Sequence, residues 1–188
     1  MFASSSSANG DDSNHFPIPE NYEFLQILGE GGFGKVIKCV KRETNQTVAV
    51  KINKLSKSYC TPKEAHILET LMEHNLDSCN IVKYEGSICS KTQTSLVFEM
   101  LDINLWDYMK YEKNQMQLED VRGIIQQLAV ALDALKSVGV IHADVKPMNI
   151  VTVDRMTQPL RVKLIDFGIA LFRSQAKPGM NFQTPAIR

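Results

Sequence analysis

The chain has 188 residues, enough for one sizeable domain or two small lobes, and 44% of them are hydrophobic, as in ordinary globular proteins. Its 21 basic and 21 acidic residues give a net charge of zero, which argues against a general binder of nucleic acids or anionic membranes. The apolar stretches are too short to span a membrane, and residues 1–7 lack the basic and apolar parts of a secretory signal, so we expect an intracellular protein.

Residues 1–16 are predicted to form a disordered tail because they are rich in Ser, Asn, Gly and Asp. Pro17 and Pro19 mark the entry to the folded part. Three short runs of alternating apolar and β-branched residues follow, at 24–28, 35–40 and 47–52, and turn-forming residues separate them. This pattern predicts a three-stranded antiparallel meander.

A helix is predicted to begin near Thr61 and Pro62, which suit an N-cap and a first turn. Its expected apolar stripe consists of Ala65, Leu68, Leu71 and Met72. Two further strands are predicted at 81–84 and 95–99. The first half of the chain should therefore form a five-stranded sheet with one helix.

After Leu101 the pattern becomes helical. A long helix is predicted over 118–138, ended by Gly139, and two short β-like runs follow at 150–153 and 161–165. The apolar face expected for this helix comprises Val121, Ile124, Ile125, Leu128, Leu132 and Leu135.

The segment 29–36 matches G-x-G-x-x-G-x-V, with glycine at positions 29, 31, 32 and 34. Glycines let backbone N–H groups approach phosphates without obstruction by a Cβ atom. The motif also marks dinucleotide-binding folds, but those require a helix directly after the loop, whereas strands are predicted on both sides here. We therefore interpret the segment as a hairpin that covers a nucleotide.

Lys51 ends the third predicted strand. In the nucleotide-binding motif set that this loop and lysine resemble, such a lysine contacts the α- and β-phosphates and pairs with a helix glutamate. Glu64 is the predicted partner, because Ile67 and Leu68 are placed to face the core. The two later glutamates of the same helix, or a solvated Glu64 without this role, are the alternatives.

Residues 98–101 end the fifth strand and are predicted to form a hinge. The backbone of Glu99 to Leu101 would face the adenine, and Phe98 would restrict the back of the pocket. Val36 and Ala49 would form its apolar roof, although as strand residues they could equally belong to an ordinary core.

The chemistry of the chain centres on His142-Ala143-Asp144-Val145-Lys146-Pro147-Met148-Asn149 and on Asp166-Phe167-Gly168 further along. Asp144 can take or orient the proton of an attacking hydroxyl, and Lys146 can neutralise phosphate charge. Asn149 and Asp166 offer the hard oxygen ligands that Mg²⁺ prefers. These residues match the protein-kinase motif set, and this resemblance implies a phosphoryl-transfer centre.

The four cysteines are scattered without C-x-x-C spacing. A zinc site made of Cys60, His74, Cys79 and Cys89 can be imagined. Reduced thiols packed as small hydrophobic groups are the simpler interpretation.

Together these motifs resemble those of eukaryotic protein kinases, over residues 22–188. The chain is more narrowly similar to the homeodomain-interacting protein kinases in three segments. The first is 141–147, which has alanine where arginine is usual. The others are 96–101, followed by Asn104 and Leu105, and 34–39, followed by Lys41 and Arg42. The resemblance implies an α+β two-lobe fold, with an N-lobe and hinge over 17–101 and a partial helical C-lobe over 102–188 that ends in the activation segment.

The resemblance also implies ATP-dependent phosphorylation of protein serine and threonine residues with Mg²⁺. Asp144 would act as the base, Lys146 would stabilise the transferred phosphate, and Asn149 and Asp166 would hold the metal. His142 and Phe167 would stack with Leu68 as a packed spine that joins the lobes, rather than His142 acting as a titrating catalyst. The nucleotide-binding residues implied are Leu28, Gly29, Glu30, Gly31, Gly32, Phe33, Gly34, Val36, Ala49, Lys51, Glu64, Glu99 and Leu101. The implied partners are protein substrates and transcription-related nuclear proteins, with no direct nucleic-acid or membrane contact, and the implied location is the nucleus or the cytoplasm.

The chain departs from the family pattern in three ways. Ala143 removes the arginine that in many kinases pairs with a phosphorylated activation loop. No tyrosine follows Tyr111, so only Thr184 and Ser174 remain as activation-loop hydroxyls in the corresponding stretch. The A-P-E motif and later helices of the family would follow Arg188, so we expect exposed apolar surface on the 118–138 helix and weak or no transfer by this chain alone. An active kinase and a catalytically dead nucleotide- or partner-binding module therefore both remain open.

Overall fold

The computed structural model describes residues 18–31, 34–53, 63–89, 94–111 and 116–180. The predicted tail at 1–16, the loop residues Gly32 and Phe33, the expected helix cap at 61–62, Cys60 and Thr184 lie outside these residues. The elements are β1 (Tyr22–Gly31), β2 (Gly34–Lys41), β3 (Gln46–Asn53), α1 (Lys63–Glu73), β4 (Tyr84–Cys89), β5 (Thr94–Glu99), α2 (Leu105–Tyr111), α3 (Leu118–Ser137), β6 (Val140–Ile141), β7 (Ile150–Asp154), β8 (Gln158–Leu164) and β9 (Leu171–Phe172), with short 3-10 turns at Leu76–Ser78, Pro147–Asn149 and Arg173–Gln175.

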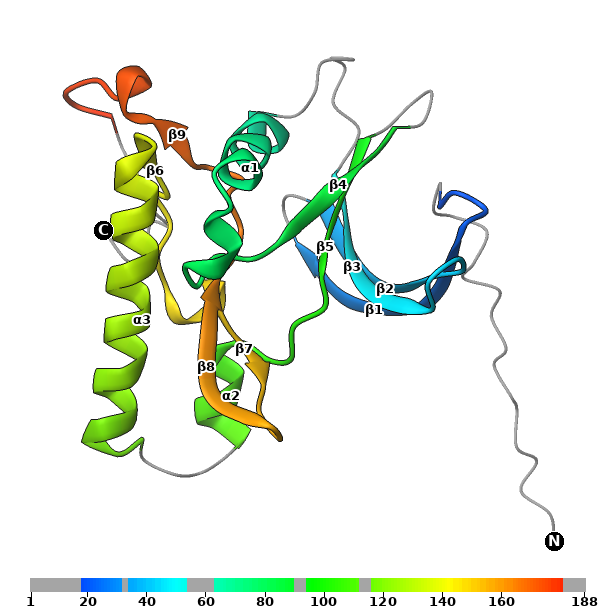
Figure 1. Ribbon diagram of the computed structural model, residues 1–188, viewed down its shortest axis with the longest axis horizontal. Coiled ribbons are helices and arrows are strands. Elements are labelled where there is room, and N and C mark those ends of the chain that lie inside the picture. Colours follow the sequence, from blue (N-terminus) through cyan, green and yellow to red (C-terminus); the bar gives the residue numbers. More distant parts are fainter. Residues whose placement is uncertain (1–17, 32–33, 54–62, 90–93, 112–115, 181–188) are drawn as a thin grey trace, which may run out of the picture.

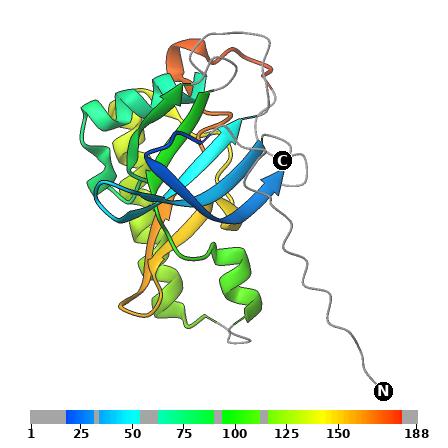
Figure 2. The ribbon, with the colours of Figure 1, turned by 90° about the vertical axis from the view of Figure 1, so that its right-hand side faces the viewer.

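A five-stranded antiparallel sheet in the order β1-β2-β3-β5-β4 forms one half of the molecule. Figure 1 shows α1 beside this sheet and α3 standing apart from it, and Figure 2 shows the sheet above α2 and the β7–β8 hairpin. The predicted meander and the five-stranded sheet with one helix are confirmed. The alternating pattern was sufficient to predict these strands, because each strand buries one apolar face against a core.

Two hydrophobic clusters lie on the elements of the sheet. The smaller cluster fills one face, where Ile18 and Tyr22 pack over the side chains of Ile37, Val48 and Val50. The larger cluster joins the buried face of α1 to β7, β8 and α3, and it includes Leu68, Leu135, Leu164 and Phe167. The two halves of the chain therefore share one core.

The strand predicted at 81–84 is displaced. β4 begins at Tyr84 and runs to Cys89, while Ile81 makes an isolated parallel bridge with Leu164 of β8. Val82 N–H also donates to Leu164 O at 3.0 Å. The apolar run is therefore extended and buried, but it pairs with β8 instead of the sheet.

The apolar face of α3 is only partly buried. Ile124 and Leu135 are buried and Leu128 packs against the core, joined by Ala131 on the same face. The other three residues of the predicted face, Val121, Ile125 and Leu132, are 36%, 58% and 42% exposed, as expected for an apolar face that is only partly covered. The apolar face of the helix is wider than the surface that packs against it, so one apolar stripe stays exposed. Exposed apolar surface on this helix was expected from the sequence.

The ends and faces of the helices otherwise follow the sequence. Gly139 has a φ of 70°, a left-handed conformation that suits glycine after a helix end, and its N–H donates to Lys136 O. On α1, Ala65, Ile67 and Leu68 are buried, but Met72 is 48% exposed and was wrongly assigned to the stripe. Among the described residues no helix is both long and apolar enough to cross a membrane.

Candidate active site

Lys51 lies at the centre of a charged cluster that joins three distant segments. Its ammonium is 2.7 Å from Glu64 Oε1 on α1 and 2.7 Å from Asp166 Oδ1 after β8. The predicted Lys51–Glu64 pair is therefore present, and the contact with Asp166 was not foreseen. Only 12% of the Lys51 side chain is exposed, so the pair is shielded from solvent.

The charge of Lys51 is stabilised by its partners. Burial alone would lower the pKa of this lysine, but the charges of Glu64 and Asp166 and the hydrogen bonds to both carboxylates outweigh burial and raise it. The ammonium therefore stays protonated, as a group that binds phosphate must.

The glycine after Phe167 lies close to the ion pairs of the site. A Cβ atom at Gly168 would lie 3.2 Å from Asp166 Oδ1 and 3.5 Å from Lys51 Nζ. A side chain here would therefore require the Asp166 carboxylate to shift by a few tenths of an ångström, whereas the contact with Lys51 is of ordinary length.

The sheet presents the predicted pocket roof on the same face as Lys51. Val36 is the cross-strand partner of Lys51, and Ala49 precedes Lys51 by two residues on β3. Partners across a strand pair and residues two apart share a face, so these three side chains point to the same side of the sheet. The buried side chains of β3, Val48 and Val50, point to the opposite side.

The glycine segment forms a hairpin between β1 and β2. Gly31 pairs with Gly34, whose φ is 140°, and Glu30 forms an ion pair with Lys35 at 3.3 Å across the strands. Leu28, just before the loop, is 40% exposed on β1. The strand–loop–strand arrangement agrees with the prediction and excludes the strand–helix arrangement of dinucleotide sites.

Asp144, Lys146 and Asn149 come together in one buried group. Asp144 Oδ2 lies 2.6 Å from Lys146 Nζ and accepts a hydrogen bond from Asn149 Nδ2 at 3.0 Å. Asn149 Nδ2 also donates to the backbone oxygen of Asp144 at 2.9 Å. Because the nitrogen of the Asn149 amide makes both contacts, its oxygen is the end that can ligate a cation.

The residues present fit a magnesium ion that is shared with a phosphate ligand. Asn149 and Asp166 supply an amide oxygen and a carboxylate, and their segments are in register because Ile165 N–H donates to Asn149 O at 2.9 Å. In the part of the chain that the structure describes, no cluster of three His, Cys, Asp or Glu side chains could hold a metal by protein ligands alone. Mg²⁺ commonly takes one or two protein oxygens and completes its shell with water and substrate phosphates. The zinc set imagined from the sequence includes Cys60, which lies outside the described residues.

His142 links the two loops of the site. Its Nδ1 accepts a hydrogen bond from Asp144 N–H at 3.1 Å, and its Nε2 lies 2.9 Å from Ile165 O. This pattern requires a neutral ring with the proton on Nε2. The ring also packs edge-on against Phe167, with centroids 4.9 Å apart. His142 is therefore a packed structural residue, as the sequence suggested.

The backbone on either side of this link is strained. Ala143 and Asp166 have φ values of 66° and 65°. Left-handed backbone in residues other than glycine costs about 1–3 kcal/mol each and persists where the surroundings impose it. Both residues directly follow the hydrogen-bonded pair His142 and Ile165, which therefore holds two strained segments together.

The stability of the fold should depend on the protonation of His142. Burial lowers the pKa of His142 below its usual value, despite the opposing hydrogen bond to Ile165 and the charges of Asp166 and Asp144. As the pH falls below about 6.5, the unfolded chain binds a proton at His142 and the folded chain does not. The free energy of unfolding should therefore fall by at most about 1.4 kcal/mol per pH unit until the folded pKa is reached.

Urea unfolding of the wild type and of His142→Asn between pH 5 and 8 measures this pH dependence of the free energy of unfolding, and the variant should show the smaller slope. His74→Asn, at an exposed position, is the control. Equal slopes for all three proteins would contradict the assignment.

Three features of the site were not found in the sequence. Besides the Lys51–Asp166 contact, they are the half-buried carboxylate of Glu99 on the hinge and the buried Lys163 that contacts it. A lysine within the apolar run of β8 was the available signal. Ser174 lies exposed in the turn Arg173–Gln175.

Comparison with known proteins identifies the fold. A family model described as protein kinase domain matches residues 22–186. The chain is 47% identical over 162 residues to "Homeodomain-interacting protein kinase 1" of Mus musculus, 48% over 162 residues to "Homeodomain-interacting protein kinase 2" of Mesocricetus auratus, and 45% over 163 residues to "Homeodomain-interacting protein kinase 1" of Caenorhabditis elegans.

Each of these matches covers 85% of this chain and 13%, 14% and 19% of the respective relative. This chain thus spans less than a fifth of the length of these relatives. The matched residues include both loops of the site and the strand that carries Lys51, and the chain belongs to the protein kinase domain family.

Proposed function

We propose that this chain forms the phosphoryl-transfer centre of a protein serine/threonine kinase that uses ATP and Mg²⁺. The observation that carries the proposal is the double contact of Lys51 with Glu64 and Asp166. It brings the nucleotide-facing sheet and the expected metal ligand to within hydrogen-bond distance of one cation. Positioning and charge stabilisation supply most of the catalysis in phosphoryl transfer, so the geometry bears directly on the reaction.

In the proposed reaction a substrate hydroxyl attacks the γ-phosphorus of ATP. Asp144 accepts the hydroxyl proton, the new P–O bond forms, and the bond to the β-phosphate oxygen breaks to leave ADP. Lys146, 2.6 Å from Asp144, neutralises charge on the transferred group, and Lys51 does so at the α- and β-phosphates. Asn149 and Asp166 would hold Mg²⁺, which screens the phosphate charge when bound.

The nucleotide is proposed to lie between the sheet and the loops of the second half. The glycine hairpin 29–34, the side chains of Leu28, Val36 and Ala49, and the backbone of Glu99 and Leu101 would surround it. The shared face of Val36, Ala49 and Lys51 supports this placement. Protein substrates are the proposed partners, and the names of the relatives make transcription-related nuclear proteins the class to test first, with the nucleus or cytoplasm as the location.

A second candidate is a module that binds nucleotide or a partner without transferring phosphate. The exposed stripe of α3 favours it, because Leu118 and Ile125 are 60% and 58% exposed. Clustered apolar side chains at a surface are typical of sites that meet another protein.

Labelling with ATP carrying a labelled γ-phosphate separates the two candidates. The 188-residue chain is incubated with a generic protein substrate and Mg²⁺, and a parallel sample contains excess chelator. The kinase proposal expects labelled phosphoserine or phosphothreonine only with Mg²⁺. Nucleotide binding without labelling would favour the binding module, and binding of neither ATP nor ADP would refute both uses of the site.

A further inference from the structure

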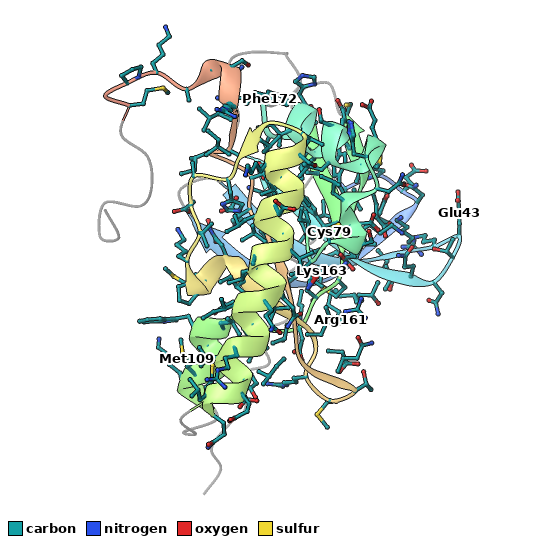
Figure 3. The ribbon with its side chains drawn as sticks, turned by 60° about the vertical axis from the view of Figure 1, so that its left-hand side comes forward. Glu43, Cys79, Met109, Arg161, Lys163 and Phe172 are labelled. Carbon is teal, nitrogen blue, oxygen red and sulfur yellow. The ribbon has the colours of Figure 1, made fainter. Side chains whose placement is uncertain are left out.

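Lys163 is a buried lysine outside the charged cluster of Lys51, Glu64 and Asp166. It lies near the end of β8, and only 9% of the residue is exposed. A charge removed from water is costly unless a partner of opposite charge compensates it. The partner is Glu99, whose Oε1 lies 2.5 Å from Lys163 Nζ. Figure 3 labels Lys163 and, two residues earlier on β8, the exposed Arg161.

The carboxylate of Glu99 joins three segments. Glu99 is the last residue of β5, and its Oε1 also accepts a hydrogen bond from Lys83 N–H at 2.6 Å. The backbone repeats this link, because Glu99 N–H donates to Lys83 O at 3.1 Å. Glu99, the second residue of the hinge 98–101, is thus tied to the segment before β4 and, through Lys163, to β8.

The residues directly after the hinge are paired with β7. Asp102 N–H donates to Thr152 O and Thr152 N–H donates to Ile103 O, each at 2.9 Å. Thr152 is fully buried, and its hydroxyl donates to Ile103 O at 3.0 Å. Met100 and Leu101 therefore lie between two fastened ends, one held by a side-chain ion pair and the other by backbone pairing.

β8 runs from the Lys163–Glu99 ion pair toward the proposed metal ligand Asp166. Leu164 N–H donates to Asn80 O at 2.8 Å, so β8 is bonded to the segment that leads into β4. The strand then continues through Ile165 to Asp166. Lys163 thus lies three positions before the proposed metal ligand Asp166, and its own ion pair is with Glu99.

We propose that Lys163 is a positioning residue for the purine base. Through Glu99 it holds the hinge backbone that would face the base, while it contacts neither base nor phosphate itself. The inference rests on the proposed nucleotide site and assigns its base-binding half to a side-chain pair. A purely structural ion pair would instead stabilise the whole fold and leave the balance between base and phosphate recognition unchanged.

The test compares Lys163→Met with Arg161→Met, an exposed neighbour whose Nη1 donates to Gln158 Oε1. Calorimetry on the 188-residue chain measures the affinities for Mg²⁺-ATP and for Mg²⁺ tripolyphosphate, which lacks the base. Lys163→Met should weaken ATP binding by about three- to tenfold, which corresponds to about 0.7–1.4 kcal/mol, and should leave tripolyphosphate binding unchanged. Lys163→Arg should restore most of the loss, and Arg161→Met should change neither affinity. Equal losses for both ligands, or no loss of ATP affinity, would overturn the proposal.

Amide hydrogen exchange without nucleotide provides the second readout. Lys163→Met should exchange faster at Glu99 to Ile103 than the wild type does, with α3 unchanged. Glu99→Gln should act in the same direction, which keeps the test available if Lys163→Met does not fold. If the wild type binds no ATP, the proposed function is wrong. If the amides of Glu99 to Ile103 exchange at equal rates in Lys163→Met and in the wild type, the role of Lys163 in holding the hinge is wrong.

Discussion

Asp144→Asn is expected to reduce phosphoryl transfer by about 10²- to 10⁴-fold while it leaves Mg²⁺-ATP binding within about twofold of the wild type. The Asp144 side chain is 9% exposed and its Oδ2 contacts Lys146 Nζ at 2.6 Å and Asn149 Nδ2 at 3.0 Å. Asparagine has nearly the same shape, but it cannot accept the hydroxyl proton. The loss should therefore appear in the rate and not in nucleotide affinity.

The measurement is the initial rate of phosphate transfer from labelled ATP, normalised to the calorimetric binding of Mg²⁺-ATP. Asp133→Asn, at an exposed position on α3, makes the same chemical change away from the site and should retain the wild-type rate. Turnover that persists in Asp144→Asn would exclude Asp144 as the base. A folded wild type that binds ATP but shows no transfer at all would favour the binding module.

Asp166→Asn is expected to remove most of the Mg²⁺ dependence of ATP binding and to lower the affinity for Mg²⁺-ATP by at least about tenfold. Its carboxylate is the charged member of the proposed metal pair and is 2.7 Å from Lys51. Replacement by an amide removes the charge that a hard divalent cation favours. Lys51 retains Glu64 as a partner, so the fold should be less affected than the site.

Titration of ATP into the variant with Mg²⁺ and with excess chelator measures this effect. The wild type should bind more tightly with Mg²⁺, and Asp166→Asn should bind with nearly equal affinity in both conditions. The exposed Asp133→Asn should behave as the wild type. Mg²⁺-dependent binding that is unchanged in Asp166→Asn would show that another group holds the metal.

The local structure followed from the sequence where one short segment was enough to determine it. Alternation predicted the strands of the meander, because each strand buries one face. Gly139 predicted the end of α3 because its left-handed φ of 70° is unfavourable for other residues. Charge and helix phase selected Glu64 as the partner of Lys51, and the ion pair is present.

Tertiary structure decided which apolar surfaces are covered and which charges meet. Val121 and Ile125 have the same periodicity as the buried Ile124, yet they are exposed because the packed elements do not reach them. Ile81 likewise pairs with Leu164 of β8 instead of a strand of the sheet, a choice that depends on tertiary packing. Periodicity reports that a segment has an apolar face, but it does not report how wide a surface that face will meet.

The charged contacts of the site show the same limit. Lys51 and Asp166 are separated by 115 positions, and Lys163 and Glu99 by 64, yet each pair lies within 2.7 Å. Such pairs form only after β8 has been placed against the hinge and the core, and many lysines and carboxylates of the chain could have paired otherwise. The sequence by itself determined the strands of the meander, α1, α3 and the chemical groups available, but not the position of β4. The packing of β8 decided which of those groups share a site, because an ion pair requires distance and burial that no local pattern encodes.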